Sequence, residues 1–161
     1  MDNNLMNTGL KLLRPHSPKI VLYGMSCVGK TTFAKTLNEH KYMCFDAMFN
    51  WHNIETLDLP IDLALQHVVD NCLCFAKFVL DGWHLADKRC ELWPLDVTAY
   101  VLYDDYDSII KRYRIPVENE SQHLPMFSKW YDLDIILPTR YFKNTEETTV
   151  EEFIVWKQHN Q

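Results

Sequence analysis

The fold of this chain is decided by residues 19–37, which read K-I-V-L-Y-G-M-S-C-V-G-K-T-T-F-A-K-T-L. The apolar run of residues 20–23 predicts a buried strand. Gly24 ends that run, and the residues from Gly24 to Thr31 match the pattern G-x-x-x-x-G-K-[ST]. Residues 30–39 then space their apolar side chains as one face of a helix does. Strand, loop and helix therefore follow one another in the order that this phosphate-binding motif requires.

Each part of the loop has a chemical role toward a polyphosphate. Glycines allow backbone angles that a side chain forbids, so a row of N–H groups can turn inward. The positive end of the helix dipole adds to this attraction. Lys30 is expected to reach the β- and γ-phosphates, and the Thr31 hydroxyl to bind Mg²⁺. The candidate nucleotide-binding residues are Gly24, Met25, Ser26, Cys27, Val28, Gly29, Lys30, Thr31 and Thr32.

Length and composition limit the class of protein. With 161 residues, the chain is long enough for one domain with a substantial core and too short for two. We expect a polar lead-in over residues 1–18 and a single domain over residues 19–161. The net charge of -6 disfavours a dedicated nucleic-acid binder, although a local basic groove stays compatible with it.

Cysteine usage and hydropathy indicate the compartment. The chain has five cysteines, and this odd number beside a nucleotide-binding loop favours free thiols in a reducing environment. No apolar stretch approaches the length of a membrane span, and the N-terminus lacks the apolar region of a signal peptide. We therefore expect a cytoplasmic protein without a membrane partner. The sequence does not indicate an oligomeric state.

Strands and helices are expected to alternate along the chain. Strands are predicted at residues 20–23, 42–45, 75–80, 97–103 and 135–137. Helices are predicted over residues 30–39, from Pro60, over residues 85–93, after Asp104 or Asp105, over residues 126–131, and from a capping box of Thr149 and Glu152. This alternation predicts an α/β fold, with a five-stranded parallel sheet and helices on both faces.

Acidic residues follow two of the predicted strands. Asp46 comes after the second strand and Asp81 after the third. Ligands of such sheets bind beyond the carboxyl ends of the strands, where the glycine-containing loop also begins. Three strand ends are thus expected to converge on one site.

With these motifs, the chain resembles the small P-loop kinases, a group that includes adenylate, shikimate, gluconate, nucleoside and polynucleotide kinases. The similarity covers about residues 19–114 and fades toward the C-terminus. It implies that Asp46 accepts the proton of the substrate hydroxyl and that Asp81 lies near Mg²⁺. It also implies a lid over residues 112–126, whose Arg112 and Arg114 bind the phosphoryl group in transfer. Phosphoryl transfer depends mainly on such positioning and charge neutralisation.

Each of these roles has a structural alternative. Asp46 would equally cap a turn after its strand, and the two arginines would equally complement the C-terminal end of a helix dipole. Arg140, predicted just after the fifth strand, is a candidate for contact with the donor base from topology alone. The aromatic residues Trp51 and Trp83 would either stack on a base or pack into the core. His52 and His84 are interpreted as loop histidines near the site.

The distribution of arginine suggests the kind of acceptor. No arginine occurs between Arg14 and Arg89, whereas kinases of phosphorylated acceptors hold the phosphate with arginine. An uncharged hydroxyl-bearing acceptor, such as a nucleoside, is therefore favoured, with ATP as donor. The closest alternative is a kinase for nucleotides or polynucleotide 5′-hydroxyls, so a nucleic acid is a less favoured partner. A third hypothesis is a nucleotide-binding sensor without kinase activity.

Overall fold

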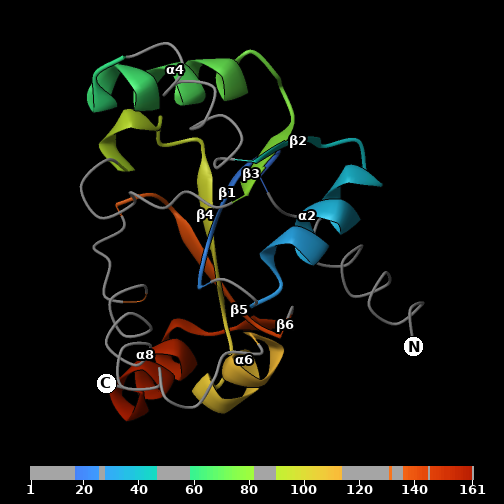
Figure 1. The fold of residues 1–161 in the computed structure, drawn as a ribbon, viewed down its shortest axis with the longest axis vertical. Coiled ribbons are helices and arrows are strands. Elements are labelled where there is room, and N and C mark those ends of the chain that lie inside the picture. Colours follow the sequence, from blue (N-terminus) through green and yellow to red (C-terminus); the bar gives the residue numbers. More distant parts are fainter. Residues whose placement is uncertain are drawn as a thin grey trace.

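A single six-stranded sheet organises the described part of the chain (Figure 1). The computed structural model describes residues 17–25, 28–46, 59–81, 90–113, 131, 136–144 and 146–160. The strand order is β2-β3-β1-β4-β5-β6. The first five strands run parallel, and β6 pairs antiparallel with β5. The α/β class predicted from the sequence is therefore confirmed.

The strands are β1 (Lys19–Tyr23), β2 (Met43–Asp46), β3 (Phe78–Asp81), β4 (Thr98–Tyr103), β5 (Thr139–Lys143) and β6 (Glu146–Thr148). The two central strands, β1 and β4, are apolar along almost their whole length because helices cover both faces of the sheet there. Their residues from Ile20 to Tyr23 and from Ala99 to Tyr103 are all buried. Because β1 is buried on both faces, its sequence is a continuous apolar run, and the strand before Gly24 could therefore be predicted.

Helical segments lie between the parallel strands, and one further helix follows β6. They are α2 (Lys30–Asn38), α4 (Ile61–Leu73), the short 3-10 helix η1 (Cys90–Leu92), α6 (Tyr106–Tyr113) and α8 (Val150–His159). Parallel strands need such crossovers, and their right-handed sense places α2 and α4 on opposite faces. In Figure 1, α4 lies at one end of the molecule, whereas α6 and α8 lie together at the other. No helix in the described ranges is long and apolar enough to span a bilayer.

Aromatic side chains fill the layers between helices and sheet. On one face, Phe33 of α2 packs against Tyr100 and Phe142, with ring centroids 6.0 and 5.5 Å apart. On the other face lies a group that we call the aromatic cluster. Its members are Tyr103, Tyr131, Tyr141, Phe153 and Trp156. The cluster fixes α8 against the ends of β4 and β5.

The C-terminal part of the sheet differs from the prediction. The fifth strand was predicted at residues 135–137 with Pro138 as its end, and this placement is wrong. Pro138 precedes β5 instead, and its carbonyl oxygen accepts a hydrogen bond from the Ala99 N–H at 2.8 Å. The number of five strands is also wrong, because the three polar residues of β6 form an edge strand without an apolar pattern. Asn144, whose φ is 51°, occupies the turn between β5 and β6 because asparagine tolerates this backbone region.

Other predicted elements agree more closely. The helices that begin at Lys30 and after Pro60 are confirmed. Thr149 caps α8 as predicted, accepting a hydrogen bond from the Glu152 N–H at 3.2 Å. Strand β3 begins later than predicted, because Cys74 and Phe75 still bond to carbonyls in the last turn of α4. The lead-in over residues 1–16 and most of the predicted helices at 85–93 and 126–131 lie outside the described residues.

Candidate functional site

The glycine loop, defined here as residues 24–31, leaves β1 in a backbone conformation that excludes side chains at its start. Gly24 has a φ of 147°. A Cβ atom added there would lie 2.5 Å from the carbonyl oxygen of Leu102 in β4. Atoms essentially never approach so closely without displacement of the backbone. Glycine is thus required because the loop begins in direct contact with the neighbouring strand.

The loop ends at the N-terminus of α2. Gly29 is the N-cap, with φ of 109° and no side-chain cap hydrogen bond. Its carbonyl oxygen accepts the first helical bond from the Phe33 N–H at 2.9 Å. The first turn of α2 contains no acidic residue. Because early N–H groups of a helix lack intrahelical acceptors, this terminus suits an anion.

Lys30 is turned back over the loop. Its side chain is buried, and its Nζ contacts the carbonyl oxygen of Gly24. Met25 and Val28, two other predicted loop residues, bury their side chains in the core, and the Val28 N–H bonds to the Met25 carbonyl at 3.3 Å. Their side chains are therefore not available to a ligand of the loop. Thr32 is exposed in the first turn of α2, and its carbonyl oxygen accepts from Thr36 Oγ1.

A hydrogen bond joins the start of α2 to the end of β3. Thr31 Oγ1 donates to Asp81 Oδ2 at 3.0 Å, although the two residues are 50 positions apart. A hydroxyl and a carboxylate oxygen are the hard ligands that Mg²⁺ prefers, and this ion commonly takes few protein ligands beside substrate phosphates. The donor set therefore fits the predicted metal. Within the described ranges, no group of three or more His, Cys, Asp or Glu residues is placed to hold a metal ion.

Asp46 ends the strand next to β3. Its Cα is the register partner of Asp81, so the two residues stand side by side at the ends of parallel strands. The sheet thus brings the backbone of Asp46 to the residue that bonds Thr31. We call this end of the sheet the carboxyl edge.

A cysteine that the sequence did not suggest lies near the carboxyl edge. Cys44 of β2 is exposed, and its Sγ donates to the Ala34 carbonyl at 3.3 Å. Partial burial of the group raises the pKa of the Cys44 thiol although the residue is exposed, and the nearby Asp81 carboxylate raises it further. The pKa of the Cys44 thiol is therefore sensitive to the charge of Asp81.

Arg112, one of the two predicted lid arginines, pairs with a buried carboxylate. Its Nη2 lies 2.6 Å from Asp104 Oδ2, and Asp104 directly follows β4. The side chain of Asp104 is 2% exposed and that of Arg112 46%. Asp104 also accepts from the Asp105 N–H at 2.7 Å. The sequence interpretation gave Asp104 only a helix-capping role, although its position after a buried strand was the signal already used for Asp46 and Asp81.

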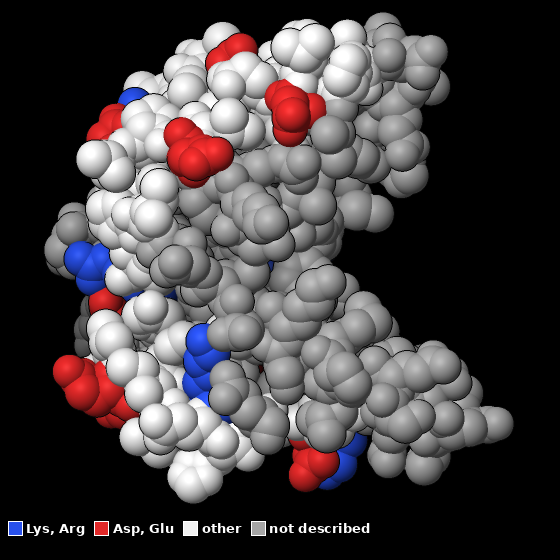
Figure 2. Space-filling view, turned by 90° about the vertical axis from the view of Figure 1, so that its left-hand side faces the viewer, with Lys and Arg blue, Asp and Glu red and all other residues white. Residues whose placement is uncertain are grey.

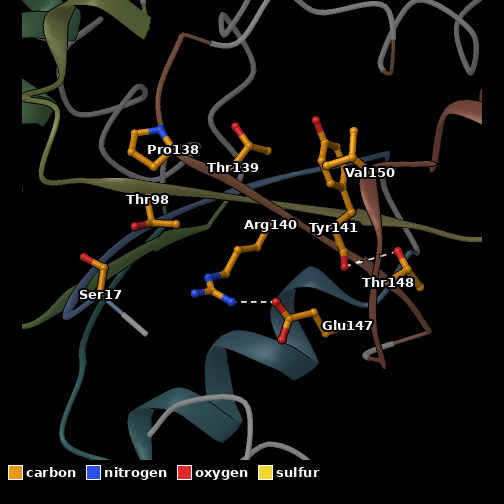
Figure 3. Close-up of a pocket in the computed structure, with 9 residues that line it drawn as sticks. All are labelled: Ser17, Thr98, Pro138, Thr139, Arg140, Tyr141, Glu147, Thr148 and Val150. Atoms are coloured by element: carbon orange, nitrogen blue, oxygen red, sulfur yellow. Dashed lines mark hydrogen bonds and ion pairs between the residues drawn. The ribbon is translucent and has the colours of Figure 1, made fainter. Parts of the chain in front are cut away.

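Arg140 lies in β5, in register with Tyr100 of β4, and lines a cavity next to β6 (Figure 3). It falls inside β5, not after the fifth strand as predicted, because that strand begins beyond Pro138. Arg140 Nη1 bonds Glu147 Oε1 at 2.6 Å. The pair lines a cavity of about 520 Å³ whose other walls include Ser17 and Thr98, near the amino ends of β1 and β4. The structure therefore pairs Arg140 with Glu147 in this cavity.

One contact to the loop was missed entirely from the sequence. The Tyr131 hydroxyl donates to the Leu102 carbonyl at 2.9 Å and accepts from the Met25 N–H at 3.1 Å. The second bond spans 106 residues, and no motif surrounds Tyr131. Nothing in the sequence near residue 131 could have indicated it.

Several predicted residues lie outside the described ranges. They are Ser26, Cys27, Trp51, His52, Trp83, His84 and Arg114, together with most of the predicted lid at 112–126.

Comparison with known proteins gives a relationship at the level of fold. No protein family and no curated protein matches the sequence. Among solved structures, the chain is similar to the unliganded crystal structure of a sugar kinase from Janibacter sp. HTCC2649, with a TM-score of 0.56 and 15% sequence identity. The match covers 89% of this chain and 95% of that one. The two proteins therefore share a fold.

Proposed function

We propose that the chain is an ATP-dependent kinase of the P-loop type, which transfers the γ-phosphoryl group to a hydroxyl of a small uncharged acceptor. The observation that carries this proposal is the hydrogen bond between Thr31 and Asp81, which joins the loop helix to a strand-end carboxylate. Phosphoryl transfer needs a phosphate cradle and a metal-side carboxylate in contact. The glycine loop and Asp81 supply this pair.

The loop residues would act by position and charge. Backbone N–H groups of the glycine loop and the start of α2 would hold the phosphates, and Lys30 would neutralise charge on them. Thr31 and Asp81 would hold Mg²⁺, which neutralises phosphate charge when bound. Asp46, in register with Asp81, would orient or deprotonate the acceptor hydroxyl. Arg112 and Arg114 are proposed to stabilise the transferred group, with Arg112 held near β4 by Asp104.

The acceptor is proposed to be a sugar or a nucleoside. The structural neighbour is titled a sugar kinase, and both compounds present the uncharged hydroxyl that the sequence favours. On the face drawn in Figure 2, the coloured basic side chains stand as isolated groups between acidic ones. The described part of that face thus offers no continuous basic track for a nucleic acid.

The test measures ADP release from ATP and Mg²⁺ with a panel of acceptors. The panel contains hexoses, pentoses, nucleosides, nucleoside monophosphates and an oligonucleotide with a free 5′-hydroxyl. A sugar or nucleoside is expected to raise the rate well above acceptor-free turnover. If only the oligonucleotide raises it, the polynucleotide alternative replaces the proposal, and if no acceptor does, the non-kinase sensor replaces it.

Two lysines of the same helix provide a matched pair of variants. Lys30→Met is expected to lower ADP release by at least about a hundredfold, since it removes charge stabilisation at the phosphates. Lys35→Met removes the same charge from an exposed position in the last turn of α2. It should leave the rate within about twofold. Equal losses in both variants would show that the charge of α2 as a whole, and not Lys30, matters.

A further inference from the structure

The Tyr131 hydroxyl occupies the junction between the glycine loop and β4. It donates to the Leu102 carbonyl and accepts from the Met25 N–H, at 2.9 and 3.1 Å. The same Leu102 carbonyl is the atom that forbids a side chain at Gly24. One hydroxyl therefore bridges the strand that limits the loop and the second residue of the loop itself.

Burial and ring packing of Tyr131 stabilise this hydrogen-bonded bridge. Tyr131 is 4% exposed, and its ring packs edge-on against Trp156 with centroids 4.9 Å apart. Burial raises the pKa of Tyr131, so the hydroxyl keeps its proton and continues to donate to Leu102 across the physiological pH range. A buried backbone N–H without a partner is costly, which makes the bond to Met25 worth more than an exposed one.

The position of Met25 bears directly on the chemistry. Gly24, its neighbour, has the carbonyl oxygen that Lys30 Nζ contacts. Holding the Met25 N–H holds the peptide unit between these two residues, and that unit contains the Gly24 carbonyl. The contact chain therefore runs from the aromatic cluster through Tyr131 to the peptide that meets Lys30.

We infer that Tyr131 is a positioning residue for nucleotide binding, which fixes the entry of the glycine loop through the Met25 N–H. The inference rests on the proposed function for its kinetic consequence. Its structural consequence, a tethered loop entry, is independent of any activity. In this role Tyr131 acts through the backbone of residues 24 and 25 and not on a reacting group.

The aromatic cluster offers a matched control. Tyr103 contacts the same Trp156, with centroids 4.8 Å apart, and its hydroxyl bonds Thr148 Oγ1 at 2.7 Å. That bond leads to the β6 side of the sheet and not to the loop. Tyr131→Phe and Tyr103→Phe each remove one hydroxyl from one cluster, but only the first releases Met25.

The kinetic experiment compares the two variants with wild type at varied ATP. Tyr131→Phe is expected to raise KM for ATP about threefold to tenfold with kcat within about twofold, since a loosened loop weakens ground-state and transition-state binding alike. Tyr103→Phe should change neither constant by more than about twofold. Equal effects of the two variants on KM, or no effect of Tyr131→Phe, would overturn the inference.

A second experiment does not depend on activity. Amide hydrogen exchange is followed by NMR at Met25 in wild type and both variants. Exchange at Met25 should accelerate in Tyr131→Phe, after scaling to exchange at the buried β4 amides, and stay unchanged in Tyr103→Phe. If wild type proves inactive with every acceptor, this measurement still decides the role of Tyr131. Unchanged exchange in Tyr131→Phe would refute that role even in an active kinase.

Discussion

Charged residues are arranged differently at the two ends of the parallel strands. The cavity near the amino ends of β1 and β4 is called the amino edge here. There, Arg140 and Glu147 come from adjacent strands of one hairpin, 7 residues apart, and neutralise each other. At the carboxyl edge, Thr31 meets Asp81 across 50 residues and Met25 meets Tyr131 across 106. A local pair can form within its hairpin alone, whereas the carboxyl edge exists only when the whole sheet is assembled.

This difference supports the proposed placement of the site at the carboxyl edge. The cavity at the amino edge is lined by Arg140 and Glu147, whose opposite charges are paired with each other (Figure 3). The carboxyl edge instead combines a loop free of side chains at Gly24, a buried lysine and two strand-end aspartates from separate segments. Convergence of distant segments on one point, and not the presence of a cavity, is thus the better guide to the site in this fold.

The largest effect is expected from the contact between Gly24 and β4. Gly24→Ala would strain the backbone and force its Cβ onto the Leu102 carbonyl, so the free energy of unfolding should fall by roughly 3–5 kcal/mol. Gly29→Ala meets no atom of the described residues within 4 Å and should cost only the strain of its positive φ, about 1–3 kcal/mol. Urea denaturation of both variants measures the difference. Equal losses would mean that backbone strain alone, and not the neighbouring strand, requires glycine at position 24.

The next effect concerns the strand-end carboxylate beside Asp81. Asp46→Asn is expected to lower kcat about a hundredfold or more, because it removes the proposed proton acceptor. The dissociation constant of ATP should change by less than about threefold, since the proposed role is toward the acceptor. Asp70→Asn, on the exposed side of α4, is the control for loss of one negative charge. A variant at position 46 that turns over at the parent rate would end the assignment of Asp46 as base.

A smaller effect tests the charge of Asp81 through Cys44. Because the Asp81 carboxylate raises the pKa of the Cys44 thiol, Asp81→Asn should lower that pKa. A larger thiolate fraction at about pH 8.5, the ordinary pKa of cysteine, should then speed alkylation about twofold to threefold. Iodoacetamide labelling followed by peptide mass spectrometry measures the rate at Cys44 itself. Equal rates in wild type and Asp81→Asn would show that the charge of Asp81 does not affect the pKa of the Cys44 thiol.

The smallest effect is expected at the amino edge. Arg140→Gln breaks a partly exposed ion pair with Glu147, so the free energy of unfolding should fall by less than about 1 kcal/mol. KM for ATP should not change, because the arginine is paired with Glu147 in the cavity next to β6. A clear rise in KM would restore the contact with the donor base that the sequence suggested.

The elements around the glycine loop were predictable because local pattern and final environment agree there. An apolar run, two glycines at a fixed spacing and an amphipathic helix each specify one part of the unit, and burial on both faces of β1 keeps its pattern simple. The same logic placed Asp46 and Asp81 at strand ends. Both are now found in register with each other.

The parts that were not predictable depend on partners far along the chain. The polar strand β6 is stable only because β5 is beside it, so its residues carry no period of their own. Pro138 was interpreted as a stop, although a proline just before a strand loses no ladder bond on that strand. Tyr131 acts through two backbone groups of β4 and the loop, and such groups leave no trace in a sequence.

The short strand β6 also determines how the sheet ends. An edge strand offers unpaired N–H and C=O groups to which another chain can add, and long apolar edges invite aggregation. Here the edge consists of three residues, and Glu146 and Glu147 are both exposed on it. An added strand would have to desolvate their carboxylates. The β5–β6 hairpin, which the sequence did not predict, thus hinders the addition of a further strand at this edge of a strongly apolar sheet.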